Sequence, residues 1–112
     1  MRLKTKIWIE NENKNLILGS GRLQILKDLM KTNNIKITAK NLNMNYRKCW
    51  GKINDINKNF GKNLIISKAG KFGGGTYLTQ ECTEILTKFD MLQKDIKEFS
   101  QKRFEEIFLN FD

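Results

Sequence analysis

The stretch from residue 45 to residue 61 constrains the fold more than any other part of this chain of 112 residues. From about Tyr46 to Phe60, apolar side chains recur at helical spacing along one face, and basic and polar side chains occupy the opposite face. This periodicity predicts an amphipathic helix. Asn45 is suited to cap the start of that helix, and Gly61 is suited to end it.

A shorter helix is expected just before it, at residues 37–42. Asn43 suits the end of that helix, because asparagine tolerates the left-handed backbone conformation. A helix, a tight turn and a capped helix within about twenty residues form the outline of a helix-turn-helix. Strand-forming residues at 64–68 and 76–79 then flank a glycine-rich stretch at 69–75, which predicts a basic β-hairpin, or wing.

Together these parts predict a winged helix-turn-helix, which places one helix in the major groove of duplex DNA and its wing on the backbone. The N-terminal region adds a short hairpin from residues 6–10 and 16–18, and a helix that starts near Arg22 with Ser20 as its cap. The expected fold is therefore mostly α with small β. It combines a DNA-binding domain at 1–79, including the N-terminal β-hairpin, with a long C-terminal dimerisation helix at 80–112 in the same compact unit.

The charge is distributed unevenly along the chain. Residues 1–79 carry 16 Lys and Arg against 4 Asp and Glu, a net charge of +12, whereas residues 80–112 carry 5 against 8, a net charge of −3. A basic body with a mildly acidic tail suggests a polyanion-binding module joined to an assembly element. The alternative is that the positive charge reflects genome composition and not a ligand, because an AT-rich genome also produces chains rich in asparagine and lysine.

Several classes of protein are disfavoured by the composition. No apolar run approaches the roughly 20 residues that span a bilayer, and the N-terminus lacks the apolar stretch of a signal peptide, so a cytoplasmic protein is expected. The two cysteines, Cys49 and Cys82, fall on apolar helix faces, and the chain has no histidine. A zinc site and a Cys–His nucleophile are therefore not expected. An enzyme, a cofactor and a small-molecule ligand are not expected of this chain either.

The first turn of the helix predicted after Asn45 has the position that reaches base edges in helix-turn-helix complexes. It carries Arg47 and Lys48, and arginine can donate two hydrogen bonds to guanine, worth roughly 1–3 kcal/mol of discrimination. Asn45 can reach adenine or a phosphate. Tyr46 and Trp50 have the phase of the apolar face, so Trp50 is expected in the core and Tyr46 at its edge, with its hydroxyl near a phosphate. The alternative is a solvated helix face with no ligand.

The predicted wing combines lysines with a run of glycines. Glycine permits positive φ and close approach of the backbone, and successive N–H groups can hold a phosphate. Phe72 at the tip is expected to pack on the DNA backbone or to enter the minor groove. A mobile glycine-rich hairpin without a ligand is the alternative. The complete set of expected DNA contacts is Lys36, Thr38, Asn45, Tyr46, Arg47, Lys48, Lys52, Lys68, Lys71, Phe72, Gly73 and Gly74.

These motifs resemble the N-terminal DNA-binding domain of the ModE family, bacterial molybdate-responsive transcriptional regulators with a LysR-type reading head. The resemblance rests on Met-x-Tyr-Arg-x-x-Trp at 44–50 and Gly-Gly-Gly-x-x-Leu-Thr at 73–79, with Gly-Ser-Gly-Arg at 19–22 and Asn57. It covers about residues 5–90 and implies operator binding by a homodimer. The motifs of the family's molybdate-binding β-barrel domains have no counterpart in these 112 residues, so molybdate binding is not expected of them.

The C-terminal helix carries an apolar seam with heptad spacing, typical of a core or a dimer interface. A second copy packed on it would hold two recognition helices about 34 Å apart, which implies an inverted-repeat operator. The rival hypothesis is a basic protein-interaction module whose third helix docks an acidic partner. The expected dimerisation residues are Ile85, Phe89, Leu92, Ile96 and Phe99.

Overall fold

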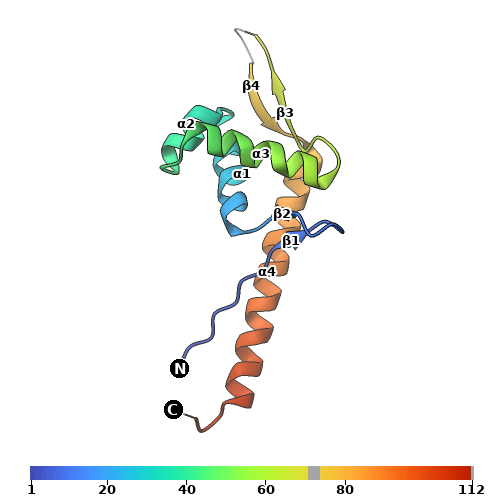
Figure 1. Ribbon diagram of the computed structural model, residues 1–112. Coiled ribbons are helices and arrows are strands. Elements are labelled where there is room, and N and C mark those ends of the chain that lie inside the picture. The colour runs from blue at the N-terminus through green and yellow to red at the C-terminus, as the bar shows by residue number, and fades with distance from the viewer. Residues whose placement is uncertain (71–73, 112) are drawn as a thin grey trace.

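The computed structural model describes residues 1–70 and 74–111 and confirms the predicted fold class, which is mostly α with small β (Figure 1). The described residues form four helices and two antiparallel hairpins, and α4 projects from the body as a stalk. The elements are β1 Ile9–Glu10, β2 Leu16–Leu18, α1 Ser20–Thr32, α2 Ile35–Asn41, α3 Tyr46–Phe60, β3 Ile65–Lys68, β4 Gly75–Leu78 and α4 Gln80–Ile107.

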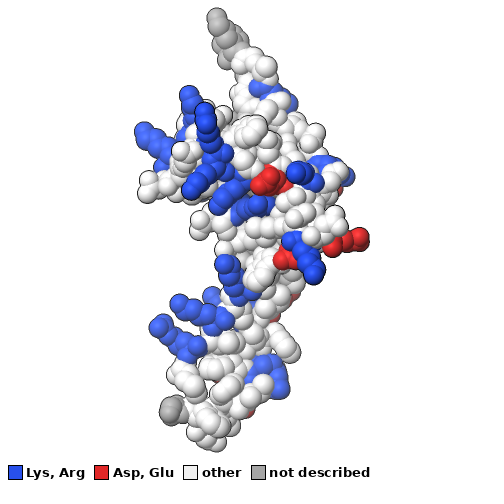
Figure 2. Space-filling view, viewed as in Figure 1, with Lys and Arg blue, Asp and Glu red and all other residues white. Residues whose placement is uncertain are grey.

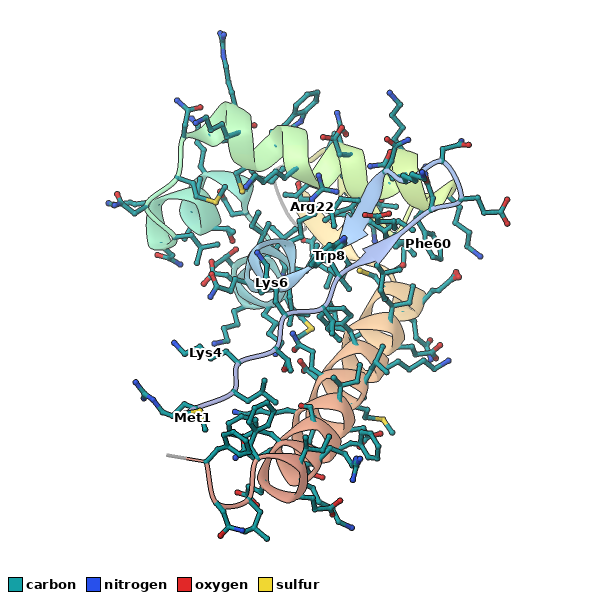
Figure 3. The ribbon with its side chains drawn as sticks, turned by 60° about the horizontal axis from the view of Figure 1, so that its bottom comes forward. Met1, Lys4, Lys6, Trp8, Arg22 and Phe60 are labelled. Atoms are coloured by element: carbon teal, nitrogen blue, oxygen red, sulfur yellow. The ribbon has the colours of Figure 1, made fainter. Side chains whose placement is uncertain are left out.

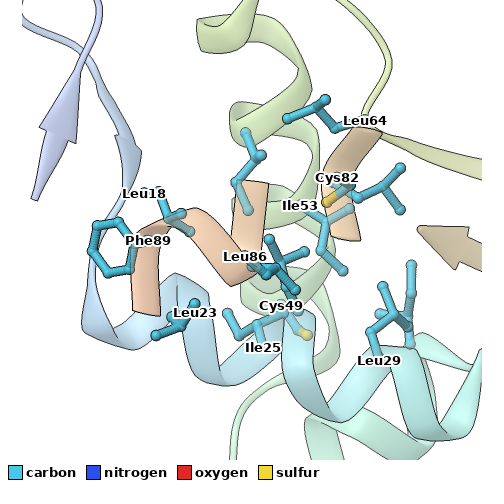
Figure 4. Packing of buried hydrophobic residues seen from close by; sticks show 14 of the residues in the cluster. Leu18, Leu23, Ile25, Leu29, Cys49, Ile53, Leu64, Cys82, Leu86 and Phe89 are labelled. Carbon is cyan, nitrogen blue, oxygen red and sulfur yellow. The ribbon is translucent and has the colours of Figure 1, made fainter. Parts of the chain in front are cut away.

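The core forms where the inner faces of α1 and α3 meet the first turns of α4 (Figure 4). Leu29 and Cys49 are fully buried, and Phe89 from α4 is 2% exposed. Burying a side chain as large as Phe89 stabilises a fold by about 1.5–3 kcal/mol relative to leaving it in water. The start of α4 therefore belongs to the same core as the helix-turn-helix.

The ends of α2 and α3 are set by asparagines and a glycine. Asn45 caps α3, with its Oδ1 accepting from the backbone N–H of Arg47 at 2.8 Å, and Gly61 ends the helix at φ 88°. Asn43 adopts φ 54°, as expected at the end of a helix. The predicted start of α2 was wrong by two residues, because Asn34 accepts from the N–H of Ile37 and caps a helix that begins at Ile35.

The expected cap of α1 was also wrong. The helix begins at Ser20 itself, and its N-cap is Gly19, which provides no side-chain hydrogen bond. Arg22 has a different task in the first turns of α1. Its guanidinium donates to the backbone oxygen of Leu16 at 2.6 Å and lies 3.8 Å from the Asp55 carboxylate of α3. Arg22 therefore ties the N-terminal hairpin to both helices.

The wing β3–β4 is attached to the body at two places, at its base and along β4. At the base, Asn57 of α3 donates to the carbonyl of Ile65 at 2.8 Å and accepts from the N–H groups of Leu64 and Ile65 at 2.9 and 3.0 Å. At the other side, the N–H of Thr76 donates to the carbonyl of Asn33, in the turn between α1 and α2, at 3.0 Å. These bonds fix the direction of the wing relative to the helix-turn-helix.

The long helix α4 has a buried beginning and an exposed remainder. Thr79 caps it, accepting from the N–H of Cys82 at 3.2 Å. Leu86 is buried although it lies outside the predicted heptad seam, because the body covers a wider face of these first turns than the seam alone. The helix spans 28 residues, about 42 Å at 1.5 Å per residue, and runs past Arg103 without a break.

Candidate nucleic-acid interface

The first turn of α3 presents its cations to solvent. Arg47 and Lys48 are both exposed, and the axis of α3 crosses the front of the molecule as seen in Figure 1. Asn45 is exposed too, but its Oδ1 accepts from the backbone of the first turn. Its outward contact would therefore have to come from the amide nitrogen. This turn has the position and the donors that a base-reading helix needs.

An open cleft of about 500 Å³ separates this helix from the wing. It is lined by the turn between α1 and α2, the start of α2, Tyr46 of α3, and the β4 end of the wing. Lys36 lines the cleft and is exposed, and Tyr46 is 44% exposed at its edge, as the phase of the helix indicated. The cleft thus joins the wing and the helix-turn-helix into one continuous surface.

The wing contributes one described lysine to this surface. Lys68 is exposed on β3, and its Nζ lies 5.4 Å from the centroid of the Tyr77 ring, a cation–π arrangement that orients the side chain. Gly74 is half-buried and its carbonyl accepts from the Tyr77 hydroxyl at 3.3 Å. The predicted contacts Lys71, Phe72 and Gly73 lie outside the described residues.

Figure 2 shows Lys and Arg side chains gathered over α2 and α3, with few acidic side chains among them. Lys52 is exposed in the middle of α3. Asp55, the acid on the outer face of this helix, lies 3.8 Å from the guanidinium of Arg22, which offsets part of its charge. The net field over this face is therefore positive, which attracts polyanions.

Two expectations about individual residues need correction. Thr38 is fully buried, and its hydroxyl lies 2.7 Å from that of Thr32, so it braces the turn between α1 and α2 and does not face a ligand. Trp50 is 50% exposed and is not a core residue. The buried face of α3 is centred on Cys49, Ile53 and Ile56, and Trp50 lies about 90° from that centre, where the rest of the chain does not cover it.

The predicted dimerisation residues divide into two groups. Phe89 is 2% exposed and Ile85 is half-buried, so both are largely used within the chain itself. Ile96 is half-buried on the stalk, whereas Leu92 is 44% exposed and Phe99 is 67% exposed. The surface that a second copy could cover therefore begins near Leu92 and extends toward the C-terminus.

Some residues of this region gave only a weak signal in the sequence. Asn33 has φ 53° and supplies the carbonyl that holds the wing, and Tyr77 lines the cleft. Two successive asparagines at 33–34 are typical of a turn, but the contact of Asn33 with β4, more than forty residues later, depends on tertiary structure. Asn57 was identified only through the family resemblance. A helical pattern does not show which polar residue will hydrogen-bond to a distant strand.

The two thiols are not exposed to reagents or ligands. Cys49 and Cys82 are fully buried. Burial raises the pKa of the Cys82 thiol to about 11, and burial also raises the pKa of Cys49. Both therefore act as small apolar groups at neutral pH. Within residues 1–70 and 74–111, no three His, Cys, Asp or Glu side chains form a group that could hold a metal ion. None of the described helices has the length and apolar character needed to cross a membrane.

The helix-turn-helix, its exposed cationic helix and the attached wing define the class: this is a winged helix-turn-helix protein. Within this class, the chain is similar in sequence to the transcriptional regulator ModE. The chain is 30% identical over 80 residues to the transcriptional regulator ModE of Haemophilus influenzae, covering 70% of this chain and 31% of that protein. It is 28% identical over 86 residues to the DNA-binding transcriptional dual regulator ModE of Escherichia coli K12, covering 75% of this chain and 31% of that protein.

The transcriptional regulator ModE of Yersinia pestis is 32% identical over 73 residues, which cover 63% of this chain and 27% of that protein. These matches confirm the resemblance to a ModE-like domain that the motifs predicted. The chain spans less than a third of the length of these relatives. No protein-family model matches the chain.

Proposed function

We propose that this chain is a sequence-specific regulator of transcription that binds duplex DNA with the helix-turn-helix and wing. The observation that carries the proposal is the joint exposure of Arg47 and Lys48 on the first turn of α3, beside a wing that hydrogen bonds hold in place. The relatives are named as transcriptional regulators, and one of them as DNA-binding, which supports the same assignment.

The proposed mechanism is binding without chemistry. Contacts from lysine and arginine to phosphates supply most of the affinity and make it sensitive to salt. Contacts from Arg47, Lys48 and Asn45 to base edges supply the sequence preference. Lys36, Lys52 and Lys68 are assigned to phosphates on either side of the groove, and Lys71, Phe72, Gly73 and Gly74 to the backbone beside the wing.

A homodimer that binds an inverted repeat is the proposed assembly. The exposed apolar side chains Leu92 and Phe99, with the half-buried Ile96 between them, make a seam on a helix that extends well beyond the body. Exposure of such an apolar seam to water is unfavourable in free energy. A second copy carries the same seam, and a two-fold axis brings the two seams together. In this proposal residues 1–79 read DNA and residues 80–112 set the spacing of the two reading heads.

The test compares Arg47→Ala with Lys52→Ala on a selected duplex and on a random duplex at several salt concentrations. We expect Arg47→Ala to weaken binding to the selected duplex by about 5- to 100-fold and to reduce the preference between duplexes, since a bidentate contact to guanine discriminates by roughly 1–3 kcal/mol. Lys52→Ala is expected to weaken both complexes alike. Lys102→Ala on α4 is the control for loss of one surface charge.

Equal losses on both duplexes for Arg47→Ala would contradict the division between base and phosphate contacts. Equal affinity of the unaltered protein for selected DNA, random DNA and heparin would contradict sequence recognition altogether. That second result would favour the rival function, a basic module that docks an acidic protein partner.

A further inference from the structure

A second basic cleft lies on α3 away from the wing. In Figure 1 the β1–β2 hairpin and the wing lie on opposite sides of α3. The cleft between that hairpin, the start of α1 and the outer face of α3 has a volume of about 400 Å³. Its cationic and aromatic lining comes from four separate segments of the chain and consists of Lys6, Trp8, Lys14, Arg22 and Lys52.

Contacts hold the aromatic wall of this cleft in place. Trp8 is 53% exposed, and its indole N–H donates to the carboxylate of Glu10 at 2.8 Å. A side chain at Gly19 would put its Cβ 3.3 Å from the Cβ of Trp8, so glycine at this position lets Trp8 lie close against the start of α1. Figure 3 shows Trp8 and Arg22 near each other, with the N-terminal segment leading away through Lys6 and Lys4.

The lining of the cleft contains one acidic residue, Glu10, against four cationic residues. Glu10 accepts from the indole N–H of Trp8, and Asp55 of α3, which is not part of the lining, lies 3.8 Å from the guanidinium of Arg22. Among the described residues, by contrast, none of the ion pairs involves Lys6, Lys14 or Lys52, three cations that line one cleft. The excess charge here is positive and directed to solvent.

Lys14 occupies a backbone position that is unfavourable for its residue type. Its φ is 68°, in the left-handed region that asparagine and glycine adopt more readily. The turn around it is held by Asn11, whose Oδ1 accepts from the N–H groups of Asn13 and Asn15 and whose amide donates to the carbonyl of Asn59. This turn places the Lys14 side chain in the same cleft lining as Lys6 and Lys52.

The first residues of the chain extend the same charge. Arg2, Lys4 and Lys6 alternate with Leu3 and Thr5 ahead of the hairpin. Thr5 and Ile7, from the other half of this alternation, line a cleft against α4. In an extended chain alternate side chains point to opposite sides at about 6.6–6.8 Å intervals, so the cations form a row on the side away from α4. All three are exposed.

We propose that this cleft is a second DNA-backbone site, in which Lys6, Lys14 and Lys52 bind phosphates of the strand that borders the groove read by α3, with Trp8 against the adjoining sugar. Arg2 and Lys4 continue the contact along the flanking duplex. This inference rests on the proposed function and extends its footprint beyond the recognition helix and wing. The contact is with phosphate and sugar and is therefore independent of base sequence.

The test uses the double variant Lys6→Gln/Lys14→Gln and the matched double variant Lys94→Gln/Lys102→Gln, which removes the same charge from the exposed face of α4. Affinity for a long selected duplex and a long random duplex is measured as a function of salt. The cleft variant is expected to lower the slope of log affinity against log salt by about 1.8, since each lost phosphate contact accounts for about 0.9. The loss is expected to be equal for both duplexes, roughly tenfold or more at 0.1 M salt, and absent in the matched control.

A second variant separates binding from folding. Lys14→Gly relieves the left-handed lysine, so its thermal stability is expected to equal or exceed that of the unaltered protein while its DNA affinity falls. In a Trp50→Phe background, Trp8 is the sole tryptophan, and its emission is expected to change with duplex DNA and to remain constant with inorganic phosphate at matched ionic strength.

Unchanged salt slopes in the cleft variant, with intact binding by the unaltered protein, would overturn the inference and leave the proposed function standing. Saturable quenching of Trp8 by inorganic phosphate would reassign the cleft to a free anion and likewise overturn it. If the unaltered protein showed no preference for any duplex, the proposed function itself would fail, independently of this cleft.

Discussion

Asparagine side chains carry much of the local order in this protein. Asn34 and Asn45 cap helices, Asn33 and Asn43 occupy left-handed positions at φ 53° and 54°, and Asn57 holds the base of the wing. Asparagine suits these places because its short amide can both donate and accept close to the backbone and tolerates positive φ. An asparagine-rich composition is therefore used structurally here, whatever its origin in the genome.

Asn57→Ala is expected to destabilise the fold by about 2–3 kcal/mol, because it leaves two backbone N–H groups and one carbonyl at the base of the wing without their partner. Asn57→Asp keeps the acceptor and loses the donor to Ile65, so its loss is expected to be smaller. Urea unfolding followed by circular dichroism measures the effect. Asn54→Ala, at an exposed position on the same helix, is the control and should change the free energy of unfolding by less than about 0.5 kcal/mol.

The buried thiol of Cys82 links stability to alkaline pH. Its pKa is raised from 9.0 to about 11, so the folded state keeps the proton over a range in which the unfolded state loses it. Stability from this group is complete below pH 9 and is lost as the pH rises from about 9 toward 11, a loss of up to about 2 kcal/mol. Cys82→Ala should flatten this part of the stability profile relative to the unaltered protein. Identical profiles for the two proteins between pH 9 and 11 would contradict the assignment.

At the scale of elements, two sets of hydrogen bonds connect the wing to the helix-turn-helix. Asn57 holds its base and the carbonyl of Asn33 holds β4, so the wing is tied to the helix-turn-helix at two points. Glycine is needed where β4 passes Asn33. Gly75 has φ 146°, and a Cβ there would lie 2.6 Å from the carbonyl oxygen of Asn33.

Gly75→Ala is therefore expected to displace β4 from the turn between α1 and α2 and to cost about 1–3 kcal/mol of stability. The cost to DNA affinity should exceed that of an equally destabilising change in the core far from the wing, such as Phe89→Leu. Unfolding curves and DNA titrations on the two variants make the comparison. Affinity losses in proportion to stability alone would show that the wing's attachment has no separate role in binding.

At the scale of the whole molecule, the densest cationic surface and the exposed apolar seam lie in different regions. Figure 2 shows cationic side chains gathered over α2 and α3. The exposed apolar side chains Leu92 and Phe99 lie on the projecting part of α4, which carries charges of both signs as well. The chain is elongated, with extents of 63 × 30 × 22 Å. A two-fold assembly through the stalks would leave both cationic faces free to meet the same duplex.

Leu92→Glu/Phe99→Glu is expected to convert a dimer into a folded monomer at micromolar concentration, because two carboxylates would oppose their copies across the symmetric seam. Sedimentation velocity measures the mass, and circular dichroism checks that the helix content persists. Met91→Glu is the control: Met91 is 60% exposed but lies about 100° from Leu92 around the helix, so the dimer should persist. A monomeric unaltered protein at the same concentration would contradict the assembly.

Much of the fold was predictable because its signals are local. The apolar periodicity of α3, its cap at Asn45, its stop at Gly61 and the glycine-rich hairpin each depend on residues within a few positions of one another. The positions of Arg47 and Lys48 on an outward first turn follow from the same periodicity. Short-range backbone preferences suffice for these features, so they can be read before any tertiary contact is known.

Other features arise only when distant segments meet. The local sequence does not distinguish Trp50 from a core residue, or Thr38 from an exposed one. Only the packing of α1, α2 and α3 leaves Trp50 half-exposed and buries Thr38. Asn57 and Asn33 become supports for the wing only because β3 and β4 return to them. The cleft around Lys14 likewise needs the N-terminal hairpin to lie against α3. Helical phase, caps and turns depend on residues within one segment, so the sequence alone determined them. Burial and clustering depend on contacts between segments, so only the tertiary structure decided them.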